Sequence, residues 1–232
     1  MPYYGYGYGY GGYGLAYSWT YLLVLAGVIV CLIASAKVRS TYNRYSSVRS
    51  MSGMTGAQAA QRILAHAGIR DVQIQHVSGN LTDHYDPREK VLRLSDSVYG
   101  SDSVAAVGVA AHECGHAIQH QRGYVPLRVR GAFVPVANFG SSIAWPLIII
   151  GLMMRGQIII EIGIICFSFA VIFQLITLPV EFNASGRAMR ILRETGILNS
   201  QELPMTGRVL RAAAMTYVAS AASAVLQLLR LI

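Results

Sequence analysis

Long apolar stretches constrain this chain more than any other feature. The hydrocarbon core of a bilayer is about 30 Å thick, and a helix needs about 20 mainly apolar residues to cross it. Residues 19–36, 132–154 and 157–180 suit this role, and the only charged side chain among them is Glu161. The composition agrees, since 53% of the residues are hydrophobic and 13% are charged. The sequence therefore predicts a mainly α-helical integral membrane protein.

A fourth stretch, residues 209–232, leaves alternatives open. Between Ala212 and Leu229 it carries no charge but is rich in alanine and serine. Such a helix could cross the bilayer, enter and leave on the same side, or pack as a buried helix.

Positive charges predict the orientation of the chain. Residues 1–18 contain no lysine or arginine, whereas four basic residues follow the first apolar stretch: Lys37, Arg39, Arg44 and Arg49. Because lysine and arginine are retained on the cytoplasmic side, we expect the N-terminus outside and residues 37 onward in the cytoplasm. The next two apolar stretches then form a hairpin that returns to a second cytoplasmic cluster, Arg187, Arg190 and Arg193.

A cleaved signal peptide is the competing interpretation of residues 1–36, because Ala34-Ser35-Ala36 resembles a processing site. The segment lacks a basic n-region, and its apolar run is longer than a usual h-region. The basic cluster behind it also lies on the wrong side for secretion. We therefore expect residues 19–36 to remain as a transmembrane helix.

The motif His112-Glu113-Cys114-Gly115-His116 spells H-E-x-x-H inside an alanine-rich, proline-free segment that predicts a helix over residues 103–120. Residues four apart share one helix face, so both imidazoles can reach one metal ion. Glu113 is then placed to act on a water molecule. The flanks are apolar and small, so these polar groups are expected to be buried, where a metal would satisfy them.

Two features of the same segment bear on how the helix begins and packs. Ser101, Asp102 and Ser103 are candidate N-caps. Gly108 and Gly115 each cost about 1 kcal/mol in a helix interior. Their presence predicts close packing against another element or against a substrate backbone.

A zinc site of this type needs a third protein ligand. Three histidines at positions i, i+4 and i+8 spread over about 12 Å of helix, whereas each ligand lies about 2 Å from the ion, so His120 is not expected to be a ligand. The extended motif H-E-x-x-H-x-x-G-x-x-H is excluded, because Gln119 and Arg122 occupy the positions of its glycine and third histidine. A distant carboxylate remains. Glu161 is expected at the outer end of the third span, and only Glu181 shares the cytoplasmic side with the motif.

Several segments resemble the YugP-type neutral zinc metallopeptidases of bacterial membranes, a gluzincin-like family. They are His112–Gln119, Leu81–Arg88, Lys90–Ser95 and Pro179–Ser185, and the resemblance extends over most of residues 19–232. It implies one catalytic Zn²⁺ held by His112, His116 and Glu181, with Glu113 as the general base.

Residues 181–188 are also loosely similar to the E-x-x-A-D-x-x-A stretch of heat-shock membrane peptidases and CAAX prenyl proteases. This chain has Ser185 where those families have aspartate. An aspartate there can support a ligating histidine. We therefore expect the support to be built differently here, with Asn183 or a backbone carbonyl.

The implied reaction is hydrolysis of a peptide bond by zinc-activated water, with Glu113 moving the proton. A further donor for the developing oxyanion is usual. The sequence offers four candidates without ranking them: His84, Tyr85, Arg187 and Tyr217. Structural roles compete, since Tyr217 can anchor a helix and Arg187 can pair with lipid phosphates.

Upstream of the motif, the sequence predicts a helix over residues 55–67, with Thr55 and Gln58 forming a capping box. Alternating residues predict strands at 72–77 and 91–94. The free edge of this small sheet could hold an extended peptide by strand addition, although an edge strand needs no such role.

The expected organisation follows from these assignments. In chain order it is a disordered Tyr/Gly-rich tail (1–18), transmembrane helix 1 (19–36), a cytoplasmic α+β zincin-like catalytic region (37–131), transmembrane helices 2 (132–154) and 3 (157–180), a cytoplasmic helix with the third ligand (181–208), and a membrane or buried helix (209–232).

The expected function is a zinc metalloendopeptidase of the cell membrane that cleaves membrane or membrane-proximal proteins at the cytoplasmic face. The alternative is a membrane scaffold or chaperone-like protein with a structural zinc site. The three cysteines suggest no disulfide framework. The net charge of +8 is explained by contact with anionic lipid. No recognition motif points to a nucleic acid.

Overall fold

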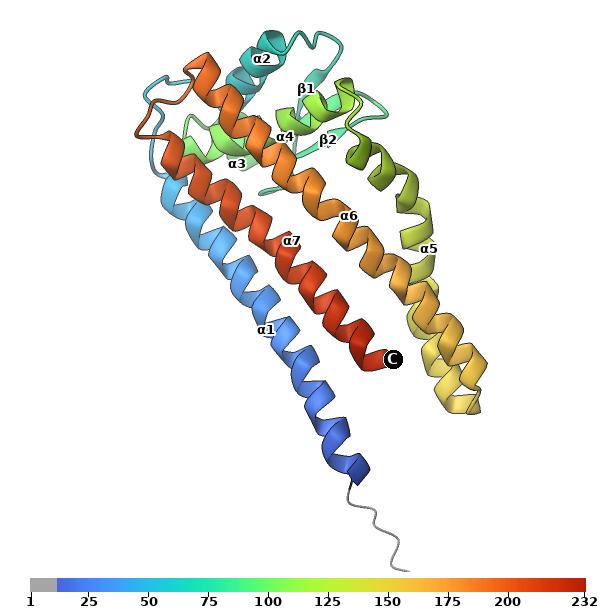
Figure 1. Cartoon of the computed structure of the whole chain (residues 1–232). Helices are drawn as coiled ribbons and strands as arrows, with labels where there is room; N and C mark the ends of the chain where they lie inside the picture. The colour runs from blue at the N-terminus through green and yellow to red at the C-terminus, as the bar shows by residue number, and fades with distance from the viewer. Residues whose placement is uncertain (1–11) are drawn as a thin grey trace, which may run out of the picture.

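Four long helices run side by side away from a smaller head (Figure 1). The computed structural model describes the backbone of residues 12–232 and the side chains of residues 20–232. The long helices are α1 (Gly12–Ser46), α5 (Val125–Met154), α6 (Gln157–Thr195) and α7 (Leu203–Leu231). All four are long and apolar enough to cross a membrane, α7 included. The prediction of a mainly helical, multi-pass membrane protein is confirmed.

Several expected helix boundaries differ from the structure, and two of the differences change an assignment. Helix α1 already begins at Gly12, and no proline interrupts residues 12–18. Those residues are therefore helical, and the rest of the expected tail lies outside the described residues. Helix α6 continues past Glu181 to Thr195, where Gly196, with a φ of 65°, ends it in the left-handed conformation. Residues 181–195 are therefore the end of α6, and the prediction of a separate helix over residues 181–208 is wrong.

Helices α5 and α6 form a hairpin held together by small residues. A Cβ atom added to Gly151 would lie 2.6 Å from Ile160 Cγ1, and one added to Gly140 would lie 2.7 Å from the Cys166 carbonyl oxygen. Small residues let helix backbones approach this closely, which is the usual way that helices associate inside a membrane.

The head carries the remaining elements. They are helices α2 (Gly56–His66), α3 (Asp96–Tyr99) and α4 (Val104–Gln121), and strands β1 (Gln73–Val77), β2 (His84–Asp86) and β3 (Val91–Ser95). Strand β3 is central, parallel to β1 and antiparallel to β2. The capping box of Thr55 and Gln58 and the two expected strands are confirmed. The three-residue strand β2 is too short to give a periodic signal.

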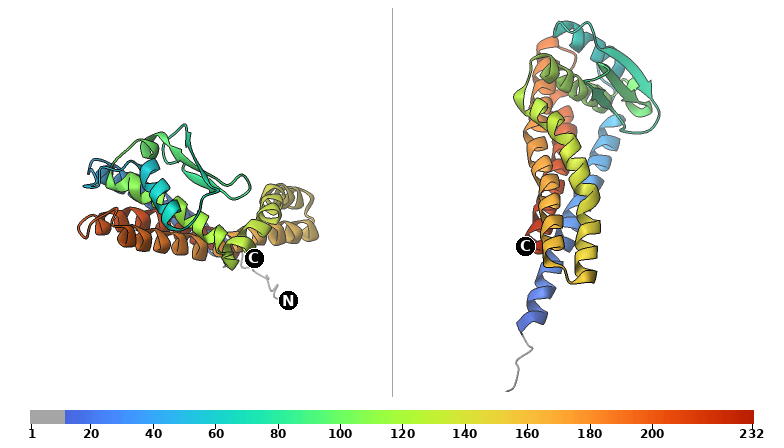
Figure 2. Two further views of the ribbon diagram at one scale, coloured as in Figure 1. Left: turned by 90° about the horizontal axis from the view of Figure 1, so that it is seen from above. Right: turned by 90° about the vertical axis from the view of Figure 1, so that its right-hand side faces the viewer.

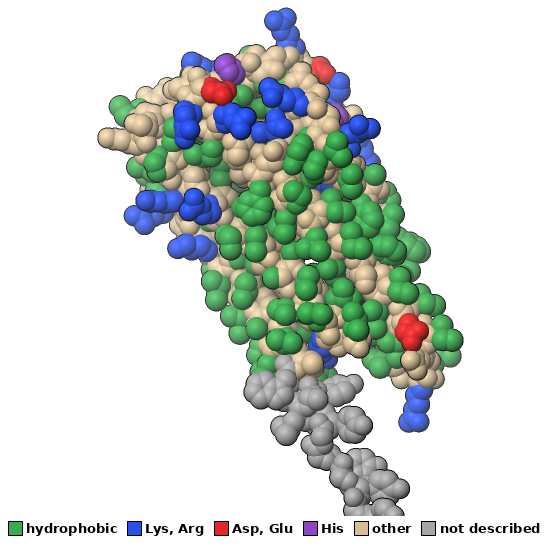
Figure 3. Space-filling model, in the orientation of Figure 1, with side chains coloured by type: hydrophobic (Ala, Val, Ile, Leu, Met, Phe, Trp, Pro, Cys, Tyr) green, Lys and Arg blue, Asp and Glu red, His purple; other side chains and the backbone are tan. Residues whose placement is uncertain are grey.

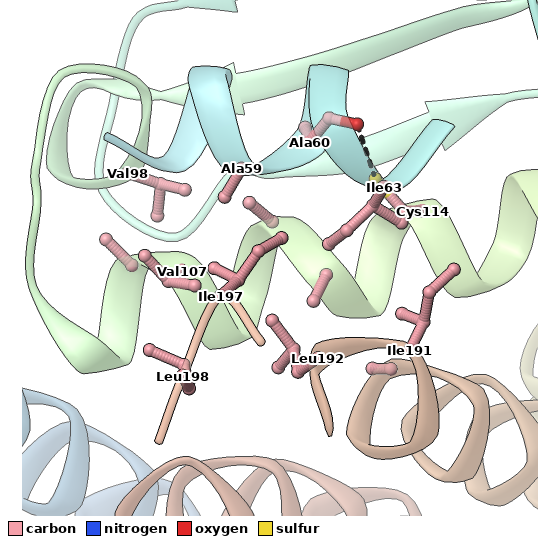
Figure 4. Close-up of a cluster of buried hydrophobic side chains, with 14 of the residues drawn as sticks. Ala59, Ala60, Ile63, Val98, Val107, Cys114, Ile191, Leu192, Ile197 and Leu198 are labelled. Carbon is pink, nitrogen blue, oxygen red and sulfur yellow. Dashed lines mark hydrogen bonds between the residues drawn. The ribbon is translucent and has the colours of Figure 1, made fainter. Parts of the chain in front are cut away.

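Helix α4 lies at the centre of the head, between α2 and the sheet on one side and α6 and α7 on the other (Figure 2). Figure 4 shows the apolar core around it, where Val107 of α4 lies among Ile63 of α2 and Leu192 of α6. All three of these side chains are fully buried. The core thus packs the head against the ends of α6 and α7 that lie nearest to it.

Polar and apolar surfaces separate along the long axis. The long helices present mostly hydrophobic side chains, whereas lysine, arginine and histidine gather around the head (Figure 3). The turn between α5 and α6 lies at the opposite end (Figure 1). An apolar band between two polar ends is the arrangement expected of a protein that crosses a bilayer.

Candidate metal centre

Helix α4 presents the H-E-x-x-H residues from the middle of the head. Of the three candidate caps, Ser103 is the N-cap, and its Oγ accepts a hydrogen bond from the backbone N–H of Ala106 at 3.1 Å. The expectation that the helix glycines mark close packing is confirmed. A Cβ atom on Gly108 would meet Thr206 of α7 at 2.6 Å, and one on Gly115 would meet the Ala184 carbonyl oxygen of α6 at 2.6 Å.

The close approach at Gly115 brings Glu181 to the two histidines. Glu181 Oε2 lies 3.3 Å from His112 Nε2 and 3.6 Å from His116 Nε2. Two ligands of a tetrahedral zinc ion, each about 2.0–2.1 Å from the metal, lie about 3.3 Å apart. The spacing of the three donor atoms therefore suits zinc. Among residues 20–232, these three side chains form the one group of this kind that could hold a metal ion.

The burial of Glu181 is a second indication that these residues suit a cation. The side chain is almost fully buried, and its Oε2 atom has no hydrogen-bond partner. Its Oε1 atom lies 3.6 Å from Nη1 of Arg130, which the sequence analysis did not single out. Because a buried carboxylate oxygen without a partner is costly, an ion among Glu181, His112 and His116 would satisfy it.

Gln119 fixes the tautomer of His116. The Gln119 side-chain N–H₂ donates to the Val180 carbonyl oxygen at 2.8 Å and to Asn183 Oδ1 at 3.0 Å. Gln119 Oε1 consequently faces His116 Nδ1, at 3.0 Å, and can only accept. The proton of the neutral ring therefore lies on Nδ1, which leaves the lone pair of Nε2 directed toward Glu181.

Ser185 supports His112 directly. Its Oγ lies 3.1 Å from His112 Nδ1. The serine at position 185 therefore contacts the histidine itself, although it replaces the aspartate of the related families. The short serine side chain reaches His112 because α6 approaches α4 closely. Asn183 instead contacts Gln119 and accepts a hydrogen bond from Arg187 Nε at 2.7 Å. Asn183 thus supports His116 only through Gln119, and Ser185 makes the direct contact with His112.

A cavity of about 730 Å³ opens beside the three donors. Glu113 lines it, next to His112 and His116, and the residues of β2 and the first turns of α5 form its walls. This volume falls within the usual range for small-molecule and cofactor sites. The cavity gives a substrate access to the donors.

Three of the five other candidates line the cavity. They are His84, Tyr85 and Tyr217, whereas Asn183 and Arg187 do not line it. The guanidinium of Arg187 lies over the ring of Tyr124, 5.7 Å from its centroid. His84 Nδ1 lies 2.9 Å from the Thr82 carbonyl oxygen.

Tyr85 carries a hydroxyl that remains protonated. Burial, followed by the charges of Asp71 and Asp86, raises the pKa of Tyr85 to about 12. The Tyr85 hydroxyl lies 2.8 Å from His120 Nδ1, so His120 contacts this tyrosine at the cavity wall. A neutral phenol can donate a hydrogen bond to a developing negative charge.

Asp83 holds the start of β2 at the cavity and was not singled out by the sequence. Its carboxylate accepts hydrogen bonds from the Ser95 backbone N–H at 2.7 Å and from Ser95 Oγ at 2.9 Å. Burial raises the pKa of Asp83, the hydrogen bonds from Ser95 lower it, and the charge of Glu113 adds to the net rise. The two carboxyl groups therefore share one electrostatic environment.

Cys114 takes no part in the site. Its thiol points away from the donors toward α2 and lies 3.7 Å from the Ala60 carbonyl oxygen (Figure 4). Burial and the nearby charge of Glu113 raise the pKa of this thiol. Cys114 is therefore kept as a neutral, inert core residue.

Comparison with known proteins agrees with the geometry. A protein of Bacillus subtilis (strain 168) named "Putative membrane protease YugP" is 48% identical over 211 residues, which cover 90% of this chain and 93% of that protein. No solved structure matches the chain. A family model described as "Putative neutral zinc metallopeptidase" matches residues 20–232. The chain belongs to this family of membrane-bound neutral zinc metallopeptidases.

Proposed function

We propose that this protein is a zinc metalloendopeptidase that hydrolyses peptide bonds of membrane or membrane-proximal proteins at the cytoplasmic face of the cell membrane. One observation carries the proposal. Three protein donors converge from α4 and α6, and Glu113 lines an open cavity directly beside them. A structural zinc site usually has four protein ligands, whereas a catalytic site keeps one position open.

His112, His116 and Glu181 would hold the ion. When bound there, zinc would act as a Lewis acid that makes water a stronger nucleophile and polarises the scissile carbonyl. Glu113 accepts the proton that the attacking water loses as the new C–O bond forms, and delivers it to the amine as the C–N bond breaks. Tyr85 and Tyr217 line the cavity as neutral donors for the oxyanion.

Strand β2 offers a place for the substrate. Only β3 pairs with it in the described sheet, and residues 83–88, which include β2, line the cavity. An extended peptide could add to the free edge of β2 through main-chain hydrogen bonds, so that side-chain sequence matters little. This arrangement would suit cleavage of unfolded or flexible segments close to the bilayer.

The test is a comparison of cells that carry the wild-type protein, Glu113→Gln or Glu161→Gln. Glu113→Gln keeps the shape of the side chain but cannot accept the proton, so released peptides should disappear and uncleaved membrane proteins should accumulate. Glu161 lies at the far end of α6, hydrogen-bonded to Gln157 at 2.9 Å, and serves as the matched control. Continued cleavage by Glu113→Gln, measured by peptide mass spectrometry, would contradict the proposal.

A further inference from the structure

A second cavity, of about 870 Å³, lies between α1 and α7, apart from the metal centre. The two helices contact each other on both sides of it. At the head end, Arg208 Nη1 donates to the Tyr45 hydroxyl at 2.8 Å. Toward the other end, a Cβ atom on Gly27 would meet Ser223 Oγ at 2.8 Å. Between these contacts, residues 30–45 of α1 and 208–222 of α7 line a groove along the surface.

The groove has one charged half and one apolar half. Four cations line its head end: Lys37, Arg44, Arg208 and Arg211. Its other half is lined by small and aliphatic side chains, with Ile33 63% exposed and Met215 49% exposed. Figure 3 shows a group of basic side chains over the upper parts of α1 and α7, directly beside the hydrophobic surface.

Within the described part of the chain, no carboxylate forms an ion pair with the four cations. None of the ion pairs among residues 20–232 involves them. By contrast, Arg49 pairs with Asp102 at 3.0 Å and Arg130 approaches Glu181. Four positive charges that line one end of a groove without an ion-pair partner favour an anionic ligand, and guanidinium groups match phosphate oxygens in a bidentate manner.

The length of the apolar half suits one leaflet of a bilayer. From Arg211 to Ala222 the helix rises about 16 Å, which is about half of the ~30 Å hydrocarbon core. A ligand that spans both halves must therefore carry an anionic head at the membrane boundary and an acyl chain inside one leaflet.

We propose that this groove is a binding site for an anionic phospholipid of the leaflet nearest the head, with the phosphate at the four cations and an acyl chain between α1 and α7. Basic pockets between transmembrane helices are a general setting for anionic headgroups. The lipid would fill the groove and brace α7, which also carries Tyr217 into the metal cavity.

Native mass spectrometry of the full-length protein, titrated with phosphatidylglycerol or with phosphatidylcholine of the same acyl chains, tests the proposal. Phosphatidylglycerol should bind more tightly. Since each cation near a headgroup contributes about fivefold in affinity, Lys37→Gln combined with Arg211→Gln should weaken phosphatidylglycerol binding about 30-fold. The matched control is Arg39→Gln combined with Arg190→Gln, which removes two charges outside the groove and should change binding little.

A second variant tests the apolar half without touching the cations. Ala222 is exposed and lines the groove, so Ala222→Trp should fill it and displace the acyl chain. Leu32→Trp, at a position that is 64% exposed and outside the groove, is the control. Thermal midpoints should confirm that all variants fold.

Several results would overturn the assignment. Equal binding of the two lipids, or equal losses in the test and control variants, would show that the groove does not select an anionic lipid. Displacement of phosphatidylglycerol by soluble glycerol phosphate would assign the cations to a free phosphate. A photo-reactive side chain in place of Met215 should crosslink to lipid in membranes, and crosslinking to a protein segment instead would assign the groove to a partner helix.

Discussion

At the scale of single residues, the side chains that contact Nδ1 of the two histidines decide how tightly the site can bind zinc. Gln119 is fully buried and uses both ends of its amide, one on His116 and the other on Val180 and Asn183. Ser185 performs the corresponding role for His112. Such partners orient ligand rings and select their tautomers, and their loss typically costs 10- to 100-fold in metal affinity.

Replacing Gln119 with leucine should therefore weaken zinc binding about 10- to 100-fold. Leucine fills a similar volume but cannot accept a hydrogen bond from His116 Nδ1, so the ring loses its fixed orientation. Gln121→Leu is the matched control, because Gln121 lies in the same helix with an exposed side chain. Competition with a zinc chelator measures the affinities. Equal affinities of the two variants would show that Gln119 does not position His116.

The surroundings of His116 should also make zinc binding depend on pH. Burial lowers the pKa of His116, but the Glu181 hydrogen bond and the charges of Glu113 and Glu181 raise it by more, so the net pKa is raised. The proton therefore stays on His116 to higher pH than usual, and zinc must displace it. Zinc affinity should rise with pH across this range and fall on acidification. An affinity independent of pH, measured by chelator competition, would contradict this.

At the scale of elements, the site depends on how closely α4 and α6 approach. A Cβ atom on Gly115 would lie 2.6 Å from the Ala184 carbonyl oxygen, a backbone atom that cannot move without α6. Glu181 and Ser185 lie on either side of Ala184 along α6. Any separation of α4 and α6 would therefore move the Glu181 carboxylate and the Ser185 hydroxyl, which contacts His112, at the same time.

Gly115→Ala should therefore weaken zinc binding and lower the free energy of unfolding by about 1–3 kcal/mol, as expected for overpacking. Gly186→Ala is the matched control in α6, because a Cβ atom there meets no atom within 4 Å. That variant should keep its zinc affinity and gain up to about 1 kcal/mol, since alanine favours helix. Chelator competition and thermal unfolding distinguish the two, and full zinc affinity in Gly115→Ala would disprove the role of close packing.

The sequence predicted what depends on local spacing. The motif His112-Glu113-x-x-His116 needs only the helical period, and the capping box of α2 needs only four residues. The partners of the histidines were not predicted, because Gln119 and Ser185 acquire their roles only once α6 lies against Gly115. Arg130 could not be foreseen either, since its approach to Glu181 depends on the angle at which α5 leaves the head.

At the scale of the whole molecule, the proposed orientation follows from the distribution of charge. Basic residues surround the head, whereas the hairpin between α5 and α6 lies at the opposite end (Figures 1 and 3). The positive-inside tendency favours the head in the cytoplasm. The metal centre would then meet its substrates at the inner surface of the membrane.

Cysteine labelling in intact cells checks this orientation. Met154 is 70% exposed at the hairpin and Met51 is 84% exposed in the head, so both sites accept a cysteine. A membrane-impermeant maleimide should label Met154→Cys in intact cells but label Met51→Cys only after lysis. The reverse pattern would place the head and its metal centre outside the cell.

The most direct test of the central claim is X-ray absorption spectroscopy of the zinc-loaded, full-length protein. The structure predicts one zinc per chain with two imidazole nitrogens and carboxylate oxygen at about 2.0–2.2 Å, and one position open to solvent. Glu113→Gln should leave the protein ligands unchanged, whereas Glu181→Gln should lose zinc. Sulfur at about 2.3 Å, or four protein ligands, would indicate a structural site and contradict a catalytic one.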